Sequence, residues 1–209
     1  MKRLILALGV LIVVCSCNTD YIEHKVCLKN NLGELSICLP PEFDTTYCWT
    51  NYSDNQCSDL EMFRFANKKY SLLREDGDWY HVRPDSLYQL TIEQPKNIEE
   101  CRDTVRFDKE YLESIEENIR AMNPGNPGIL TVEIRTIQKR NFIVIEQKFQ
   151  TEKNCKFTLK LVPEIRGHYI VVIKFACQSK DCTNFIDRIE KSLNSIKITE
   201  HEQIDAERN

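Results

Sequence analysis

The chain has 209 residues, of which 29% are charged and 42% are hydrophobic, and its formal net charge is −4. These values are typical of one globular domain, and they exclude an intrinsically disordered chain. The acidic balance, and the lack of any run of five Lys or Arg residues, argue against nucleic acid or an anionic membrane surface as partner.

The first 16 residues have the pattern of a secretory signal peptide. Lys2 and Arg3 form a basic start, and an uninterrupted apolar stretch runs from Leu4 to Val14. A membrane-spanning helix needs about 20 apolar residues, so this stretch is too short to span a bilayer. It has the dimensions of the apolar region of a signal peptide, and we expect residues 1–16 to be removed.

The end of this segment, Val14-Cys15-Ser16-Cys17, resembles the lipobox of bacterial lipoproteins. The lipobox has an aliphatic residue three positions before an invariant cysteine and a small residue directly before it. Cys17 fits this pattern, whereas Cys15 stands at an unusual position within it. The alternative is a plain signal peptide that is cleaved nearby.

The lipobox resemblance implies that Cys17 carries a diacylglyceryl thioether and anchors the protein to a lipid bilayer. Two or three acyl chains hold a protein firmly at a membrane. Asn18 follows the cysteine, and in many Gram-negative bacteria an Asp at that position favours the inner membrane. The predicted location is therefore the cell envelope, at the outer membrane of a Gram-negative bacterium. Cleavage would remove two cations and no acid, taking the net charge from −4 to −6.

A short tether, residues 17–23, precedes a predicted hairpin over 25–40 with its turn at Asn30 to Gly33. If the turn is centred between Leu32 and Gly33, Cys27 and Cys38 lie opposite each other on the polar face. The core face would hold the apolar residues of alternate positions, which are Val26, Leu28, Leu35, Ile37 and Leu39. The spacing predicts a Cys27–Cys38 disulfide.

The next segments read as a loop followed by strands. Residues 42–59 are predicted to form a polar loop, and alternation predicts strands over 60–67 and 86–95. Asp76-Gly77 is a turn signal between them.

A helix is predicted over 108–122, with Asp108 as its N-cap and an apolar stripe on one side. Its stripe consists of Leu112, Ile115, Ile119 and Met122. Four strands over 129–137, 142–150, 156–163 and 168–177 follow, and their short connections predict an antiparallel meander. A second helix over 183–194, with Thr183 as N-cap, precedes a polar tail at 199–209. The predicted domain covers 24–198.

Eight cysteines remain after Cys17, an even number in a chain expected in an oxidising compartment, so we expect disulfides. They are Cys27, Cys38, Cys48, Cys57, Cys101, Cys155, Cys177 and Cys182. Beyond the hairpin pair, Cys177 and Cys182 flank a short loop, Cys48 and Cys57 bracket another, and Cys101 with Cys155 remain by elimination. A zinc site is the alternative, but the four histidines are scattered, so we predict no metal and no cofactor.

Runs of strands with two helices predict an α+β fold, an antiparallel sheet with helices packed on it. The stretches SICLPPEF and FIDRIEKSLNSIKI, with the helix and meander between them, resemble the PsbP-like α/β/α sandwich of many small bacterial lipoproteins. This resemblance implies an assembly factor or adaptor, and it implies no catalytic residues.

None of the common catalytic or nucleotide-binding motifs occurs, so an enzyme is not predicted. Two groups of side chains have the composition of protein-interface anchors. They are Trp79, Tyr80, His81 and Arg83, and, in the predicted loop, Trp49 and Tyr52. The alternative for both groups is simple packing on the sheet.

Short Asp-Ser/Thr stretches are similar to the O-glycosylation sequon of some Gram-negative anaerobes. The candidate acceptors are Thr45, Ser86 and Thr104.

These observations predict a lipid-anchored, non-enzymatic binding or adaptor module of the envelope with an unidentified protein partner. The alternative is an immunity protein that blocks a toxin delivered to the periplasm; an enzyme is a third possibility.

Overall fold

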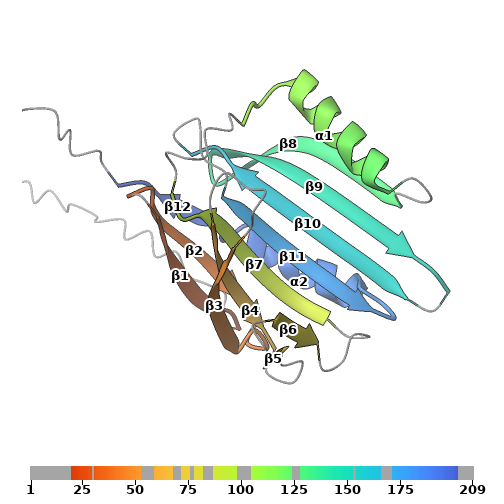
Figure 1. Cartoon of the computed structure of the whole chain (residues 1–209), viewed down its shortest axis with the longest axis horizontal. Helices are drawn as coiled ribbons and strands as arrows, with labels where there is room; N and C mark the ends of the chain where they lie inside the picture. Colours follow the sequence, from red (N-terminus) through yellow and green to blue (C-terminus); the bar gives the residue numbers. More distant parts are fainter. Residues whose placement is uncertain are drawn as a thin grey trace, which may run out of the picture.

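The computed structural model describes residues 20–29, 31–52, 59–67, 72–75, 78–81, 87–97, 105–123, 128–152, 154–165 and 171–201. In this part of the chain, twelve strands form three antiparallel sheets and two helices accompany them (Figure 1). Neither helix is long and apolar enough to cross a membrane.

The largest sheet has seven strands in the order β3-β4-β7-β11-β10-β9-β8. These are β3 (Thr45–Asn51), β4 (Leu60–Ala66), β7 (Leu87–Pro95), β8 (Ile129–Ile137), β9 (Arg140–Gln150), β10 (Cys155–Pro163) and β11 (Val172–Ser179). The predicted meander is confirmed, because β8, β9, β10 and β11 pair consecutively and antiparallel. The predicted polar loop over 42–59 is wrong in part: its β-branched and aromatic residues form β3, which pairs with β4.

A three-stranded sheet consists of β1 (Ile22–Leu28), β2 (Gly33–Leu39) and β12 (Lys197–Thr199), and a two-stranded sheet of β5 (Leu72–Glu75) and β6 (Asp78–His81). The predicted hairpin and its core face are confirmed, since the five apolar residues of that face are at most 5% exposed.

The predicted register of this hairpin is wrong, and with it the Cys27–Cys38 disulfide. Leu28 pairs with Gly33, so the turn is centred two residues earlier than expected, and Asn31 takes a left-handed conformation with φ of 56°. Cys27 therefore lies opposite Glu34, and Cys38 lies opposite Glu23. The pairing shifts by four positions, an even number, which keeps every side chain on its predicted face.

The main hydrophobic core lies between the seven-stranded sheet, the small β1-β2-β12 sheet and helix α2 (Thr183–Leu193). Figure 1 shows α2 behind the large sheet and α1 (Lys109–Met122) along β8 at its far edge. The predicted α+β, PsbP-like sandwich is wrong, because the described chain is dominated by strands and its helices are short. The predicted fold had helices packed on the sheet. In the structure, the small sheet covers much of the core instead, with apolar residues such as Leu35 and Ile37.

Helix α1 begins as predicted at Asp108, whose carboxylate accepts a hydrogen bond from the Tyr111 backbone N–H at 2.8 Å. Leu112, Ile115 and Ile119 pack against a second core cluster built on Ile143 and Ile145 of β9. Met122 does not belong to this contact, because it is 81% exposed at the helix end. β9 is therefore buried on both faces of the sheet.

Helix α2 begins one residue earlier than expected, because Thr183 was predicted as its N-cap. Thr183 is its first helical residue, and Cys182 occupies the N-cap position without a side-chain capping bond. The Asp181 carboxylate replaces the cap: it accepts from the Thr183 backbone N–H at 2.9 Å and from its hydroxyl at 2.7 Å. This arrangement places the Cys182 thiol inside the core, where it is 1% exposed.

A candidate anion-binding hollow on the large sheet

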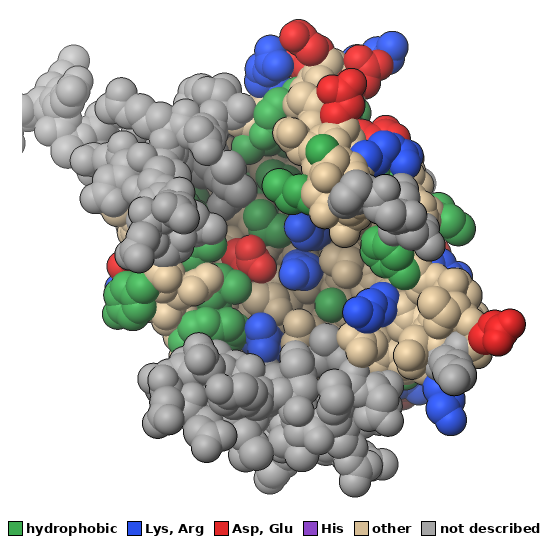
Figure 2. Space-filling model, turned by 45° about the vertical axis from the view of Figure 1, so that its right-hand side comes forward, with side chains coloured by type: hydrophobic (Ala, Val, Ile, Leu, Met, Phe, Trp, Pro, Cys, Tyr) green, Lys and Arg blue, Asp and Glu red, His purple; other side chains and the backbone are tan. Residues whose placement is uncertain are grey.

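The face of the large sheet beside α1 carries three half-buried cationic side chains. In the strand register, Arg64 on β4 pairs with Thr91 on β7, Thr91 with Lys174 on β11, and Lys174 with Lys160 on β10. All four side chains therefore point to the same side of the sheet. In Figure 2, Lys and Arg side chains gather in a hollow of this face, next to the hydrophobic side chains under the helix.

The α1 helix forms one wall of this hollow, because its apolar stripe covers β8, β9 and the Val162 end of β10. The helix stops short of Lys160 and Lys174, which are half-buried. Glu93 lies on the same face of β7, so a single carboxylate accompanies three cations. The described part of the chain shows no ion pair within 4 Å for any of these four residues.

Arg64 is held by stacking rather than by an ion pair. Its guanidinium carbon lies 4.7 Å from the centre of the Trp49 ring, and Trp49 projects from the neighbouring edge strand β3. A cation–π contact of this kind holds the charge in place without neutralising it. The positive charge of Arg64 thus remains available to an incoming anion.

Two buried polar atoms on this face lack hydrogen-bond partners. They are Nε of Arg64 and Oε1 of Gln89, and the Gln89 side chain is only 7% exposed. Gln89 lies two positions from Thr91 on β7, hence on the same face. Leaving a buried polar atom unpaired costs about 1–3 kcal/mol, so such atoms call for an explanation, and a ligand site is one.

Burial lowers the pKa values of both Arg64 and Lys160. For Lys160, repulsion from Lys174 lowers the pKa further, while Glu93 opposes the shift. For Arg64, Glu93 and then Tyr47 oppose the shift that burial causes. Lysines directly opposite each other destabilise a sheet, so this arrangement reduces stability rather than supporting it.

Replacing Lys160 with Met is therefore expected to raise the free energy of unfolding by about 1 kcal/mol at pH 7. Because folding lowers the pKa of Lys160 below 10.5, the unfolded chain binds more protons between the folded value and 10.5. The wild type gains stability as the pH rises through that window, so the advantage of the variant should shrink there. Urea unfolding at several pH values measures this, and a variant less stable than the wild type at pH 7 contradicts it.

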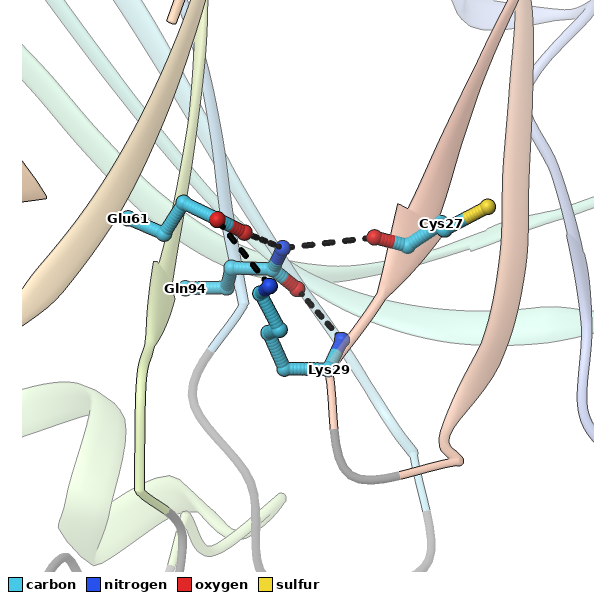
Figure 3. Close-up of polar contacts among 4 residues, drawn as sticks. All are labelled: Cys27, Lys29, Glu61 and Gln94. Carbon is cyan, nitrogen blue, oxygen red and sulfur yellow. Dashed lines mark hydrogen bonds and ion pairs between the residues drawn. The ribbon is translucent and has the colours of Figure 1, made fainter. Parts of the chain in front are cut away.

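A second polar cluster joins the small sheet to the large one and has a structural role (Figure 3). Gln94, 1% exposed at the end of β7, accepts from the Lys29 backbone N–H at 3.0 Å and donates to the Cys27 carbonyl at 3.3 Å. Its amide also donates to Glu61 at 2.9 Å, and Glu61 pairs with the Lys29 ammonium at 3.1 Å. Each of these polar side chains has a partner within the cluster, which indicates a structural role.

A further hollow lies on the opposite face, beside α2, with a volume of about 270 Å³. Its lining includes Phe43, Tyr88, Phe185 and the ion pair of Arg188 with Glu42. Its volume falls slightly below the roughly 300–1,000 Å³ of ligand pockets, and its main charges neutralise each other. The cationic hollow is the stronger candidate.

Only part of the predicted interface group can be placed. Trp49 lies at the edge of the cationic hollow. Tyr52 is 74% exposed, and the centre of its ring lies 5.6 Å from the Lys96 ammonium nitrogen. Trp79, Tyr80 and His81 belong to β6, whose side chains are outside the description, as is Arg83. Their predicted partner contacts stay predictions.

Of the candidate glycosylation sites, Thr45 begins β3, and its hydroxyl donates to Asp44 at 3.0 Å. Ser86 and Thr104 lie outside the described residues, as does the lipidation candidate Cys17.

The cysteines differ from the predicted framework. Cys38 is disulfide-bonded. Cys27, Cys48, Cys155, Cys177 and Cys182 are free thiols in the structure, so none of the four predicted pairs is formed. Cys57 and Cys101 lie outside the described residues. Within the described part of the chain, no group of three or more His, Cys, Asp or Glu residues has the arrangement of a metal site.

The cationic hollow itself was not predicted from the sequence. Arg64, Lys160 and Lys174 each stand at alternate positions of amphipathic strands, where a charged residue normally faces water. Only the order of β4, β7, β11 and β10 brings them together. One signal was present in the sequence. Lys160 and Lys174 each stand within a strand whose directly adjacent residues are apolar and buried.

Searches against protein-family profiles and curated proteins find no match. Among solved structures, LpqN, a protein involved in cell envelope biogenesis of Mycobacterium tuberculosis, aligns over 86% of this chain and 91% of its own, with 13% identity and a TM-score of 0.35. That score is too low for the likeness to support an argument about fold or function.

Proposed function

We propose that this protein is a lipid-anchored, non-enzymatic binding module of the cell envelope that holds an anionic group of a protein partner in the cationic hollow. The observation that carries the proposal is the set of three half-buried cations, Arg64, Lys160 and Lys174, which have no ion-pair partner within 4 Å among the described residues. Partly desolvated cations bind carboxylates or phosphates more strongly than exposed ones do.

The hollow supports binding better than it supports catalysis. Its described polar groups include the cations, the Glu93 carboxylate, the Gln89 amide, the buried Thr91 hydroxyl, and the hydroxyls of Tyr47 and Thr158. A threonine hydroxyl without an adjacent general base is a weak nucleophile. Arg64, braced by Trp49, instead offers the planar donor geometry that pairs with carboxylates and phosphates.

The overall charge of the chain favours the hollow over the rest of the surface as the site for an anion. A net charge of −4, or −6 after cleavage before Cys17, repels anionic partners from most of the surface. An acidic partner is then favoured at the one cationic hollow described, which gives selectivity in addition to affinity. The predicted thioether at Cys17 would keep this surface close to the membrane.

The experiment compares binding of a hexa-aspartate peptide and of pyrophosphate by calorimetry at low salt. The double variant Lys160→Gln/Lys174→Gln should bind both probes at least about tenfold more weakly than the wild type, since a charge-assisted hydrogen bond contributes about 1.5–3 kcal/mol. A matched control, Lys180→Gln/Lys197→Gln, removes the same charge from exposed positions outside the hollow and should bind like the wild type.

Equal weakening in both double variants would show that only net charge matters, and the hollow would not be the site. Preference for the peptide supports a carboxylate-bearing partner, whereas preference for pyrophosphate indicates a phosphate-bearing one. Binding should also weaken as salt is raised.

A further inference from the structure

Three cysteines that are distant in sequence meet in the main core. Cys155 opens β10 and Cys177 lies near the end of β11, on adjacent strands in which Phe157 pairs with Cys177 and Cys155 with Ser179. Both side chains point to the core face. Cys182, the residue directly before α2, belongs to the same core cluster. The three residues are 1%, 2% and 1% exposed.

Cys182 stands between the other two thiols. Its sulfur donates to the Cys155 carbonyl oxygen at 3.5 Å, and the pKa of Cys182 responds to the thiols of both Cys177 and Cys155. Cys177 has the Ser179 hydroxyl as its additional partner, at 3.9 Å. A single buried cysteine is usually a small packing residue, but a buried thiol that lies beside two others forms a site for sulfur chemistry.

We propose that Cys182 is the shared member of an intramolecular disulfide site, forming a bond with either Cys155 or Cys177, and that the third thiol exchanges into that bond. Because Cys182 has one sulfur, the two disulfides exclude each other. One thiol of the three always stays reduced.

The oxidant that this step requires is a small-molecule or protein disulfide, for which oxidised glutathione serves as the probe. The Cys182 thiolate attacks one sulfur of glutathione disulfide, whose S–S bond breaks and releases one glutathione thiolate. The second cysteine, as thiolate, then attacks Cys182 and displaces the other glutathione thiolate. Two protein thiols are oxidised, one external disulfide is reduced, and the two glutathione thiolates take up the two protons.

The two bonds constrain the chain differently. Cys155 and Cys182 are 27 positions apart, so their bond closes a long loop and joins the start of α2 to β10. The Cys177–Cys182 bond closes a short loop at the corner between β11 and α2. The longer loop restricts the unfolded chain more strongly, so the Cys155–Cys182 form is expected to stabilise the fold more.

Burial, reinforced by neighbouring thiols, raises the pKa of Cys155 and Cys182 to about 11, and burial raises the pKa of Cys177 as well. The attacking thiolate is therefore scarce at neutral pH. Oxidation of the folded protein should accelerate about tenfold per pH unit between pH 7 and 9, in proportion to the thiolate fraction.

The test is disulfide mapping of the full chain after incubation with glutathione disulfide, blocking of free thiols by alkylation and non-reducing digestion. The wild type should give both Cys155–Cys182 and Cys177–Cys182 linked peptides. Cys155→Ser should give only the second and Cys177→Ser only the first. In both variants, the alkylated fraction of Cys182 should fall at least about tenfold on oxidation.

The mapping of the wild type decides the proposal even where a variant fails to fold. Recovery of Cys182 in alkylated form from the oxidised wild type, or a Cys155–Cys177 linkage there, would overturn it. These outcomes do not involve the cationic hollow, because Cys155 and Cys177 lie on the opposite face of the sheet.

Discussion

Replacing Phe175 with alanine is expected to lower the free energy of unfolding by about 3–5 kcal/mol. Phe175 is fully buried at the centre of β11, between its register partners Leu90 on β7 and Leu159 on β10. Removal of the ring leaves a cavity where strands from both halves of the chain meet, and the rigid sheet can only partly close it.

Urea unfolding followed by circular dichroism measures this loss. Met122→Ala is the control, because Met122 is 81% exposed and its truncation should change stability by less than about 0.5 kcal/mol. A Phe175→Ala variant that lost less than about 1 kcal/mol would show that β11 is not the centre of the core.

Gly33→Ala is expected to cost about 3 kcal/mol and to detach β12 from β2. Gly33 has a φ of +123°, a conformation that L side chains rarely adopt. A Cβ at this position would also lie 1.9 Å from the Thr199 carbonyl oxygen and 2.8 Å from the Glu200 Cα. Since both neighbours are backbone atoms, the clash can be relieved only by moving the β12 strand.

Hydrogen exchange tests this, because the Ile198 segment should lose amide protection while β9 and β10 retain theirs. The matched control is Asn31→Gly in the same turn. Asn31 has a φ of 56°, which glycine adopts freely, so this change should be close to neutral. Protection of β12 that survives in Gly33→Ala would contradict the pairing of β12 with β2.

Local patterns predicted the elements of this fold more successfully than their assembly. The 3-4 spacing of Leu112, Ile115 and Ile119 predicted α1, and alternation predicted the meander, because both depend on which face a residue presents. The loop over 42–59 was wrong in part since β3 is an edge strand with mostly half-buried or exposed residues. An edge strand leaves little hydrophobic contrast in the sequence.

The hairpin of β1 and β2 shows that alternation predicts the buried face of a strand but not its register. Alternation determined the buried face of β1 and β2, but a shift of two residues in the turn preserves that face and changes every cross-strand pair. Cys27 and Cys38 were paired on the assumed turn, and the actual turn at Asn31 separates them. Disulfide connectivity depends on distances that alternation does not encode.

The sequence by itself determined the signal-peptide pattern with its Cys17 candidate, the acidic net charge, the two helices and the antiparallel meander, because each depends on composition or on neighbours within a few residues. Only the tertiary structure decided that strands dominate the fold, that Arg64, Lys160 and Lys174 share one hollow, and that Cys155, Cys177 and Cys182 share one contact. The reason is physical: strand order and sheet packing place residues more than a hundred positions apart beside each other, and no local period in the chain records which strands will pair.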